Sequence, residues 1–112
     1  MSLQNLIFMK SLETIRLQLK QGLFEFTYHA FQRSLKRNIS KREIQEVGDS
    51  VTIIEDYPDD KYSPSCLVLG WTFSNRPLHL QVSRLDSEVV RIITIYEPDS
   101  DRWTDNYSKR SL

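Results

Sequence analysis

The sequence predicts an α+β fold in which N-terminal helices pack on a four-stranded, mostly antiparallel sheet. Apolar side chains recur at helical spacing in the first half of the chain, whereas strand-like runs fill the second half. Only short, turn-rich segments join these runs, and short links favour an antiparallel meander because parallel neighbours need long crossovers. With 112 residues, the chain is expected to form one domain spanning residues 1–112.

Three helices are expected in the N-terminal half. They cover residues 3–21, 27–38 and 40–48. Gly22 follows the first apolar pattern and is a typical stop signal. Thr27 is a candidate N-cap for the second helix, with Ala30 and Leu35 facing inward. Ser40 and Glu43 have the spacing of a capping box, which predicts the start of the third helix.

Four strands are expected in the C-terminal half. They are Val51–Tyr57, Cys66–Phe73, Leu78–Arg84 and Val89–Glu97. The last run is too apolar for an exposed edge and is therefore expected to be central. From Pro98 the chain is polar, with Trp103 and Tyr107 expected to anchor it to the body. The expected core comprises Ile53, Leu67, Leu69, Leu80, Val82, Ile93 and Ile95, with Leu35, Ile44 and Val47 packed against them.

Charge is divided unevenly along a chain whose net charge is zero. Residues 1–42 carry eight basic and two acidic side chains, a net +6, and residues 43–112 carry a net −6. No acid occurs between Phe26 and Arg42. Such a basic face can hold a polyanion, or it can be an ordinary solvated helix surface.

The sequence also indicates the cellular compartment and argues against several kinds of cofactor and metal chemistry. No apolar run is long enough to span a bilayer, the N-terminus does not resemble a signal peptide, and a single cysteine cannot form an internal disulfide. We therefore expect a cytoplasmic protein with no membrane partner. The glycine-rich phosphate-binding motifs are absent, and His29, His79 and Cys66 lack metal-ligand spacing. No cofactor or metal is expected.

One candidate functional group lies on the second helix. His29, Arg33 and Arg37 are spaced i, i+4 and i+8, so they follow one stripe, and Lys36 adds a further positive charge. Guanidinium groups match phosphate oxygens in pairs, and a histidine can transfer a proton. The alternative is a surface helix with solvated arginines.

A second candidate group lies on the last two strands. Alternation places His79 on the face opposite Leu78 and Leu80, and places Thr94 and Tyr96 with Ile92. Hydroxyl groups in an apolar strand need hydrogen-bond partners, and His79 is a candidate partner across the pair. The alternative is a tyrosine at the sheet rim and a histidine bonded to a backbone carbonyl.

An ordered series of motifs resembles a bacterial and cyanobacterial family labelled a domain of unknown function. The motifs are Tyr28-His29-Ala30-x-x-Arg33-x-x-x-Arg37, Glu55-Asp56-Tyr57-Pro58-Asp59-Asp60, Pro64-Ser65-Cys66-Leu67-Val68-Leu69-Gly70, Arg76-Pro77-Leu78-His79 and Ile93-Thr94-Ile95-Tyr96-Glu97-Pro98-Asp99, with Trp103. Members of this family are often encoded beside zinc-finger proteins similar to the MqsA (YgiT) antitoxin. The resemblance covers residues 24–110 and leaves out the helix at residues 1–22.

The resemblance implies a fold similar to the RelE and MqsR toxins, whose open sheet face binds RNA. It implies the toxin of a type II toxin–antitoxin pair, an mRNA interferase-like RNA endonuclease without a metal, with RNA and a zinc-finger antitoxin as partners. In such a reaction a base takes the 2′-OH proton and an acid protonates the leaving oxygen. The candidate catalytic residues are His29, Arg33, His79 and Tyr96, and the candidate RNA-binding residues are Lys36, Arg37 and Thr94.

The competing hypothesis is a non-catalytic protein-interaction module. The oppositely charged halves of the chain are compatible with self-association, for example as a homodimer. If the chain is an enzyme, we expect His29, Arg33 and His79 to share one cleft between the second helix and the sheet. If His79, Arg33 and Tyr96 converge on one concave pocket, the enzyme is favoured, and if they point to different surfaces, the interaction module is favoured.

Overall fold

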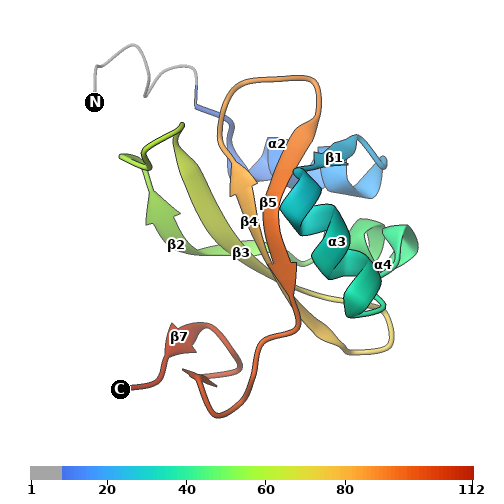
Figure 1. Ribbon diagram of the computed structural model, residues 1–112, viewed down its shortest axis with the longest axis vertical. Coiled ribbons are helices and arrows are strands. Elements are labelled where there is room, and N and C mark those ends of the chain that lie inside the picture. Colours follow the sequence, from blue (N-terminus) through green and yellow to red (C-terminus); the bar gives the residue numbers. More distant parts are fainter. Residues whose placement is uncertain (1–8) are drawn as a thin grey trace.

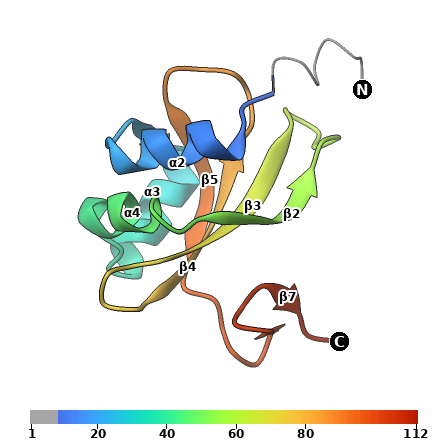
Figure 2. The same ribbon diagram turned by 180° about the vertical axis from the view of Figure 1, so that it is seen from behind.

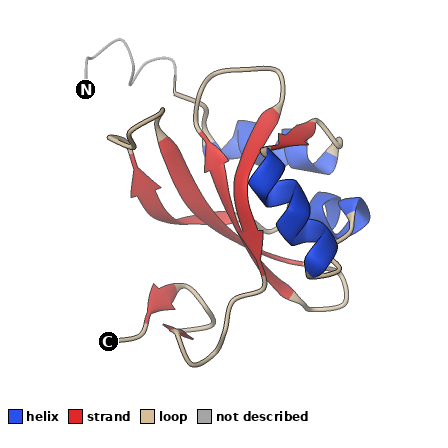
Figure 3. Ribbon diagram, viewed as in Figure 1, coloured by secondary structure: helices blue, strands red, loops and turns tan. Residues whose placement is uncertain are grey.

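The computed structural model describes residues 9–112. Its helices and strands are, in order, α2 (Leu12–Lys20), β1 (Phe24–Phe26), α3 (Tyr28–Lys36), α4 (Lys41–Val47), β2 (Thr52–Tyr57), β3 (Ser65–Trp71), β4 (Pro77–Ser83), β5 (Val90–Tyr96), β6 (Trp103–Thr104) and β7 (Lys109–Arg110). The helices gather on one side of a twisted sheet, and the C-terminal strands lie away from them (Figure 1). Figure 3 shows the helices and strands in separate colours. The predicted α+β class is confirmed.

Each helix begins where a side chain caps its first turn. The capping side chains are those of Ser11, Thr27 and Ser40. The capping box of Ser40 and Glu43 forms as predicted, with each residue bonded to the backbone N–H of the other. Gly22 adopts a φ of 76°, a left-handed conformation that closes the C-terminus of α2 at little steric cost.

The first predicted helix, residues 3–21, is only partly confirmed. Residues 3–8 lie outside the described residues. Residues 9–11 are not helical: Met9 forms a bridge with Leu85, and the Lys10 N–H donates to the Arg84 carbonyl. Pairing with the sheet therefore delays the helix until Leu12, where Ser11 can cap it.

Within residues 9–112, the main sheet has five strands in the order β1-β5-β4-β3-β2. Strands β2 to β5 form the predicted antiparallel meander. The prediction missed β1, which pairs in parallel with β5. Three residues are too few to show a strand pattern, and the pairing partner is distant in sequence. β5 lies between β1 and β4, so its predicted central position is confirmed.

The hydrophobic core lies between the helices and one face of the sheet. Its buried residues include Ile15, Leu19, Ala30, Ile44, Val47, Cys66, Val68, Leu78, Leu80, Val82, Val90, Ile92 and Ile95. At Gly70 in β3 an added Cβ would lie 2.6 Å from Val47 Cβ and 2.6 Å from Val51 Cγ1. The missing side chain at Gly70 therefore lets α4 approach the sheet closely.

Two predicted core positions are wrong. The pairing of β4 with β5 shifts register between Gln81 and Val82, so Ile93 is bulged out of the alternation and only partly buried. Because of this bulge, Ile92 and Ile95 both face the helices. On α3, Leu35 is 62% exposed, and Ser34 is buried in its place. The small side chain of Ser34 allows the helix to lie close to β5.

The other predicted core residues follow the register of the sheet. Leu80, Val82 and Ile95 are buried beneath the helices, together with the helical residues Ile44 and Val47, whereas Ile53 is partly buried. Leu67 and Leu69 are buried on the opposite face, which carries no helix.

A C-terminal segment, residues 98–112, covers part of this second face. Its strands β6 and β7 form a short hairpin, seen from behind in Figure 2. Trp103 is buried and Tyr107 is partly buried, as the predicted anchoring requires. Arg110 also binds Glu55 of β2 at 2.7 Å. Within residues 9–112, no helix has both the length and the apolar character needed to cross a membrane.

Candidate functional site

Helix α3 presents a basic flank to solvent. Its inward positions are the small residues Ala30 and Ser34, while Arg33 Nε donates a hydrogen bond of 2.8 Å to His29 Nε2. A cavity of about 420 Å³ runs along this flank. It is lined by His29, Gln32, Arg33, Lys36 and Arg37. Four basic side chains therefore surround one depression on a helix without acids.

A second cavity adjoins the first, since Arg33 and Arg37 line both. It measures about 470 Å³ and lies between α3, the end of β5 and the C-terminal segment. Its lining consists of Arg33, Arg37, Tyr96, Glu97, Asp99, Arg102, Trp103 and Arg110. We call this second cavity the arginine cavity.

The four arginines that line the arginine cavity outnumber its two carboxylates, Glu97 and Asp99. Arg110 pairs with Glu55, and Glu97 pairs with Arg76 at 2.6 Å. In the described part of the chain, no carboxylate forms an ion pair with Arg33, Arg37 or Arg102. The cavity can therefore bind an anion with several guanidinium groups, and bidentate phosphate binding is the chemistry that suits them.

Tyr96 lines the arginine cavity, and its hydroxyl is held by His79. The Tyr96 hydroxyl lies 3.1 Å from His79 Nδ1, and His79 Nε2 lies 2.8 Å from the Tyr107 carbonyl oxygen. Because a carbonyl only accepts, His79 Nε2 must carry the proton, and Nδ1 accepts from Tyr96. The phenol oxygen keeps its lone pairs for a ligand, and the Arg37 guanidinium lies 5.9 Å from the Tyr96 ring centroid.

Burial keeps both members of this pair neutral. His79 is 0% exposed, and desolvation lowers the pKa of its imidazole. Desolvation also raises the pKa of the Tyr96 phenol, against the opposing charge of Arg110. Trp103 completes the enclosure, with its ring centroid 4.4 Å from that of His79. The pair is therefore suited to orient a ligand by hydrogen bonding rather than to carry charge.

Comparison with known protein families shows which family the chain belongs to. Residues 26–97, more than half of its length, match a family described as a domain of unknown function, DUF4258. The chain belongs to the DUF4258 family. No curated protein and no solved structure was found to match it. The DUF4258 match includes α3 and β2 to β5 but ends before the C-terminal segment, so Arg102, Trp103 and Arg110 come from outside it.

The predicted site residues of this DUF4258 domain are only partly brought together. Arg33, Arg37 and Tyr96 line the arginine cavity, whereas His29 and Lys36 line the adjoining cavity with the same two arginines. The prediction that His29, Arg33 and His79 share one cleft is wrong for His79. Its side chain is fully buried behind Tyr96 and lines neither cavity.

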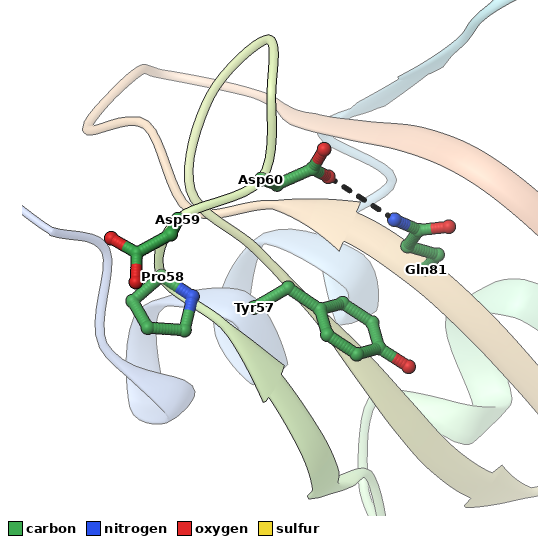
Figure 4. A pocket seen from close by; sticks show the side chains of 5 residues that line it. All are labelled: Tyr57, Pro58, Asp59, Asp60 and Gln81. Carbon is green, nitrogen blue, oxygen red and sulfur yellow. Dashed lines mark hydrogen bonds between the residues drawn. The ribbon is translucent and has the colours of Figure 1, made fainter.

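Thr94 lies apart from both basic cavities. It pairs with Gln81 on the face of the sheet that carries no helix. Gln81 in turn lines a third cavity of about 540 Å³ together with Tyr57, Pro58, Asp59 and Asp60 (Figure 4). Thr94 is therefore placed between the arginine cavity and this third cavity.

No local pattern in the sequence marks Arg102 and Arg110 as site residues. Both follow the matched family region in a polar tail, and only the folding of the tail against β2 and β5 brings them to Tyr96. Trp103 was expected to anchor that tail, which it does by packing on His79. Its place in the lining of the arginine cavity depends on the same contact.

In the described residues of the DUF4258 domain, the other potentially reactive side chains are either buried or too far apart to form a site. In residues 9–112 no group of three or more His, Cys, Asp or Glu side chains is arranged to hold a metal ion. Cys66 is fully buried, and desolvation raises the pKa of its thiol to about 12. A thiol in this state is a poor nucleophile.

Proposed function

We propose that this DUF4258 domain is the toxin of a type II toxin–antitoxin pair and cleaves RNA without a metal ion. The observation that carries the proposal is the arginine cavity, where Arg33 and Arg37 meet a Tyr96 hydroxyl fixed by buried His79. Helices on one face of an antiparallel meander, as in RelE-like ribonucleases, support the same proposal. A zinc-finger antitoxin similar to MqsA is the proposed protein partner.

In the proposed reaction, the RNA phosphate binds the guanidinium groups of Arg33 and Arg37. Phosphate binding draws Arg33 away from His29, which frees His29 Nε2 to accept the 2′-OH proton. The 2′-oxygen then attacks phosphorus, and the arginines stabilise the negative charge that develops on the phosphorane. The Tyr96 oxygen, whose proton is donated to His79, accepts a hydrogen bond from a sugar hydroxyl and holds the sugar in place. A proton donor, either His29 or solvent, completes the departure of the 5′-oxygen.

The test is RNA cleavage in the presence of a metal chelator. We expect the wild type to cut a broad RNA panel and to spare the corresponding DNA, which lacks the attacking 2′-OH. Arg33→Ala should be at least about 100-fold slower, the usual effect of removing a group that stabilises transition-state charge. Arg91→Ala is the matched control, because Arg91 is an exposed arginine of β5 that lines neither basic cavity.

Two results would contradict the proposal. Equal rates for the wild type and a correctly folded Arg33→Ala would remove Arg33 from the reaction. Absence of cleavage and of growth inhibition on expression in bacteria would contradict the toxin itself. Growth inhibition that is relieved by the neighbouring gene would support both the toxin and its antitoxin.

A specific observation also favours the alternative, a non-catalytic interaction module. Tyr28, Phe31 and Leu35 lie at i, i+3 and i+7 on α3 and are 78%, 47% and 62% exposed. Helical geometry places this apolar stripe away from Arg33 and Arg37. If the module self-associates through the stripe, sedimentation should show a dimer that Leu35→Glu dissociates. A monomer at all concentrations would contradict that self-association.

A further inference from the structure

Arg76 belongs to a sequence motif, Arg76-Pro77-Leu78-His79, whose arginine the proposed reaction does not use. It is the last residue of the turn that joins β3 to β4. The Thr72 N–H donates to the Arg76 carbonyl at 2.9 Å, and the Arg76 N–H donates to Thr72 Oγ1 at 3.0 Å. Because Thr72 is buried, the Arg76 side chain extends from a well-fixed backbone.

The Arg76 guanidinium bonds to three separate parts of the structure. Its Nε donates to Glu97 Oε1, directly after β5, at 2.6 Å. Its Nη1 donates to Glu43 Oε2 of α4 at 2.9 Å and to the Asn38 carbonyl at 3.0 Å. Its Nη2 donates to the Arg37 carbonyl at 3.0 Å. A lysine could not make these contacts together, because its donors radiate from a single nitrogen atom.

The two carbonyl contacts hold the end of α3. Carbonyl groups of a last helical turn lack partners within the helix and carry the negative end of its dipole, so a cation stabilises them. Arg37 is the C-cap residue of α3, and it also lines the arginine cavity. Arg76 therefore fixes the backbone from which the Arg37 guanidinium extends into the site.

The contact with Glu97 decides which partner this carboxylate takes. Glu97 lines the arginine cavity, its side chain is 50% exposed, and its ion pair is made with Arg76. Without Arg76, the arginines of the cavity would be the remaining partners for the carboxylate. Carboxylates and phosphates bind guanidinium groups in the same bidentate way, so Glu97 would then compete with the ligand.

We propose that Arg76 is a positioning residue of the arginine cavity, which keeps Glu97 from occupying the arginines that bind an anionic ligand. The inference rests on the proposed function for the identity of that ligand, an RNA phosphate, and it names the residue that keeps the phosphate site open. Arg76 lines neither basic cavity, so it acts through Glu97 and Arg37 rather than on the phosphate.

Sulfate binding tests the state of the cavity without any reaction. Sulfate is a tetrahedral dianion like phosphate, and it can be titrated into the ¹⁵N-labelled full chain at constant ionic strength. We expect it to shift the backbone amides of Arg37 and Trp103 and the side-chain Nε–H of Arg33. Arg76→Gln lacks the charge that holds Glu97. It should weaken binding about fivefold, the upper value for a partly exposed carboxylate–arginine pair that sulfate must displace.

Two double variants separate the role of Glu97 from a change in net charge. Arg76→Gln/Glu97→Gln should restore the wild-type affinity, because no carboxylate is released to compete. Arg76→Gln/Glu43→Gln is the matched control with the same net charge, and it should stay weak. Glu43 is the other carboxylate partner of Arg76 but lines neither basic cavity, and a glutamine can keep its capping box. If Arg76→Gln does not fold, Arg76→Lys replaces it, with a smaller loss and the same pattern of rescue.

Four results would overturn the inference. They are an unchanged sulfate affinity in folded Arg76→Gln, and the absence of sulfate binding to the wild type. Equal restoration by both double variants would show an effect of net charge alone. Restoration by neither would show a purely structural role for Arg76.

RNA cleavage distinguishes this inference from the proposed function. Cleavage by the wild type, combined with an unchanged sulfate affinity in Arg76→Gln, would overturn the role of Arg76 and leave the ribonuclease intact. The expected pattern of sulfate binding without any RNA cleavage would contradict the ribonuclease and leave Arg76 as the positioning residue of an anion site.

Discussion

Alanine substitutions at Ile95 and Ile93 test the register of the central strand. The two isoleucines are two positions apart on β5, and strict alternation would place them on the same face. The bulge at Ile93 separates them: Ile95 is fully buried opposite Leu80, whereas Ile93 is only partly buried. The same chemical change should therefore have unequal effects on the free energy of unfolding.

The expected magnitudes follow from the burial of each side chain. Replacing isoleucine with alanine removes three carbon groups, worth about 0.8 kcal/mol each when buried, or about 2.4 kcal/mol for Ile95. The cavity left beneath the helices adds to this, so a total loss of about 3 to 4 kcal/mol is expected. Ile93 is partly in water and leaves no closed cavity, so its loss should be about 1 kcal/mol.

Urea unfolding followed by circular dichroism measures both losses. The two midpoints should differ by about 1 to 2 M urea, with the slope m unchanged. Equal losses, or a larger loss for Ile93→Ala, would refute the bulge and with it the placement of Thr94 and Tyr96 on the face of His79.

Two further predictions concern packing and pH. Gly70→Ala should destabilise the fold by about 1 to 3 kcal/mol in the same urea assay, because the added Cβ overlaps Val47 and Val51; a neutral effect would contradict the close approach of α4. Burial lowers the pKa of His79, so the unfolded chain binds the extra proton first, and stability should fall as pH drops through about 6.5 toward 5. His79→Gln should flatten this slope relative to the wild type in thermal unfolding, and an equal slope in both would contradict the buried neutral imidazole.

Local signals in the sequence predicted much of the fold. Cap residues such as Ser40 and turn residues such as Gly22 act within a few positions, so the helix boundaries near them were predictable. The bulge at Ile93 was not, because it depends on how β4 and β5 pair rather than on the residues of β5 alone. Leu35 misled the prediction for a similar reason, since the close approach of α3 to the sheet selects the smaller Ser34.

The candidate site was predictable where it depends on one helix or one strand pair. Because His29 and Arg33 are spaced i, i+4, they are close enough to form the observed hydrogen bond. His79 likewise contacts Tyr96 across the β4–β5 pair. The burial of His79 was not predictable, because Trp103 covers His79 from a C-terminal segment whose fold depends on tertiary contacts.

The parallel pairing of β1 with β5 sets an order of events during synthesis of the chain. Phe24 pairs with Val90, 66 positions later, so the first strand to leave the ribosome waits for the last strand of the main sheet. Until β5 emerges, α3 lacks the strand on which it packs, and the aromatic residues of β1 stay in water. Non-local contacts of this kind form late and slow the folding of small domains. A free chain truncated before residue 90 should therefore keep α4 against the β2–β4 meander but leave α3 without the strand on which it packs.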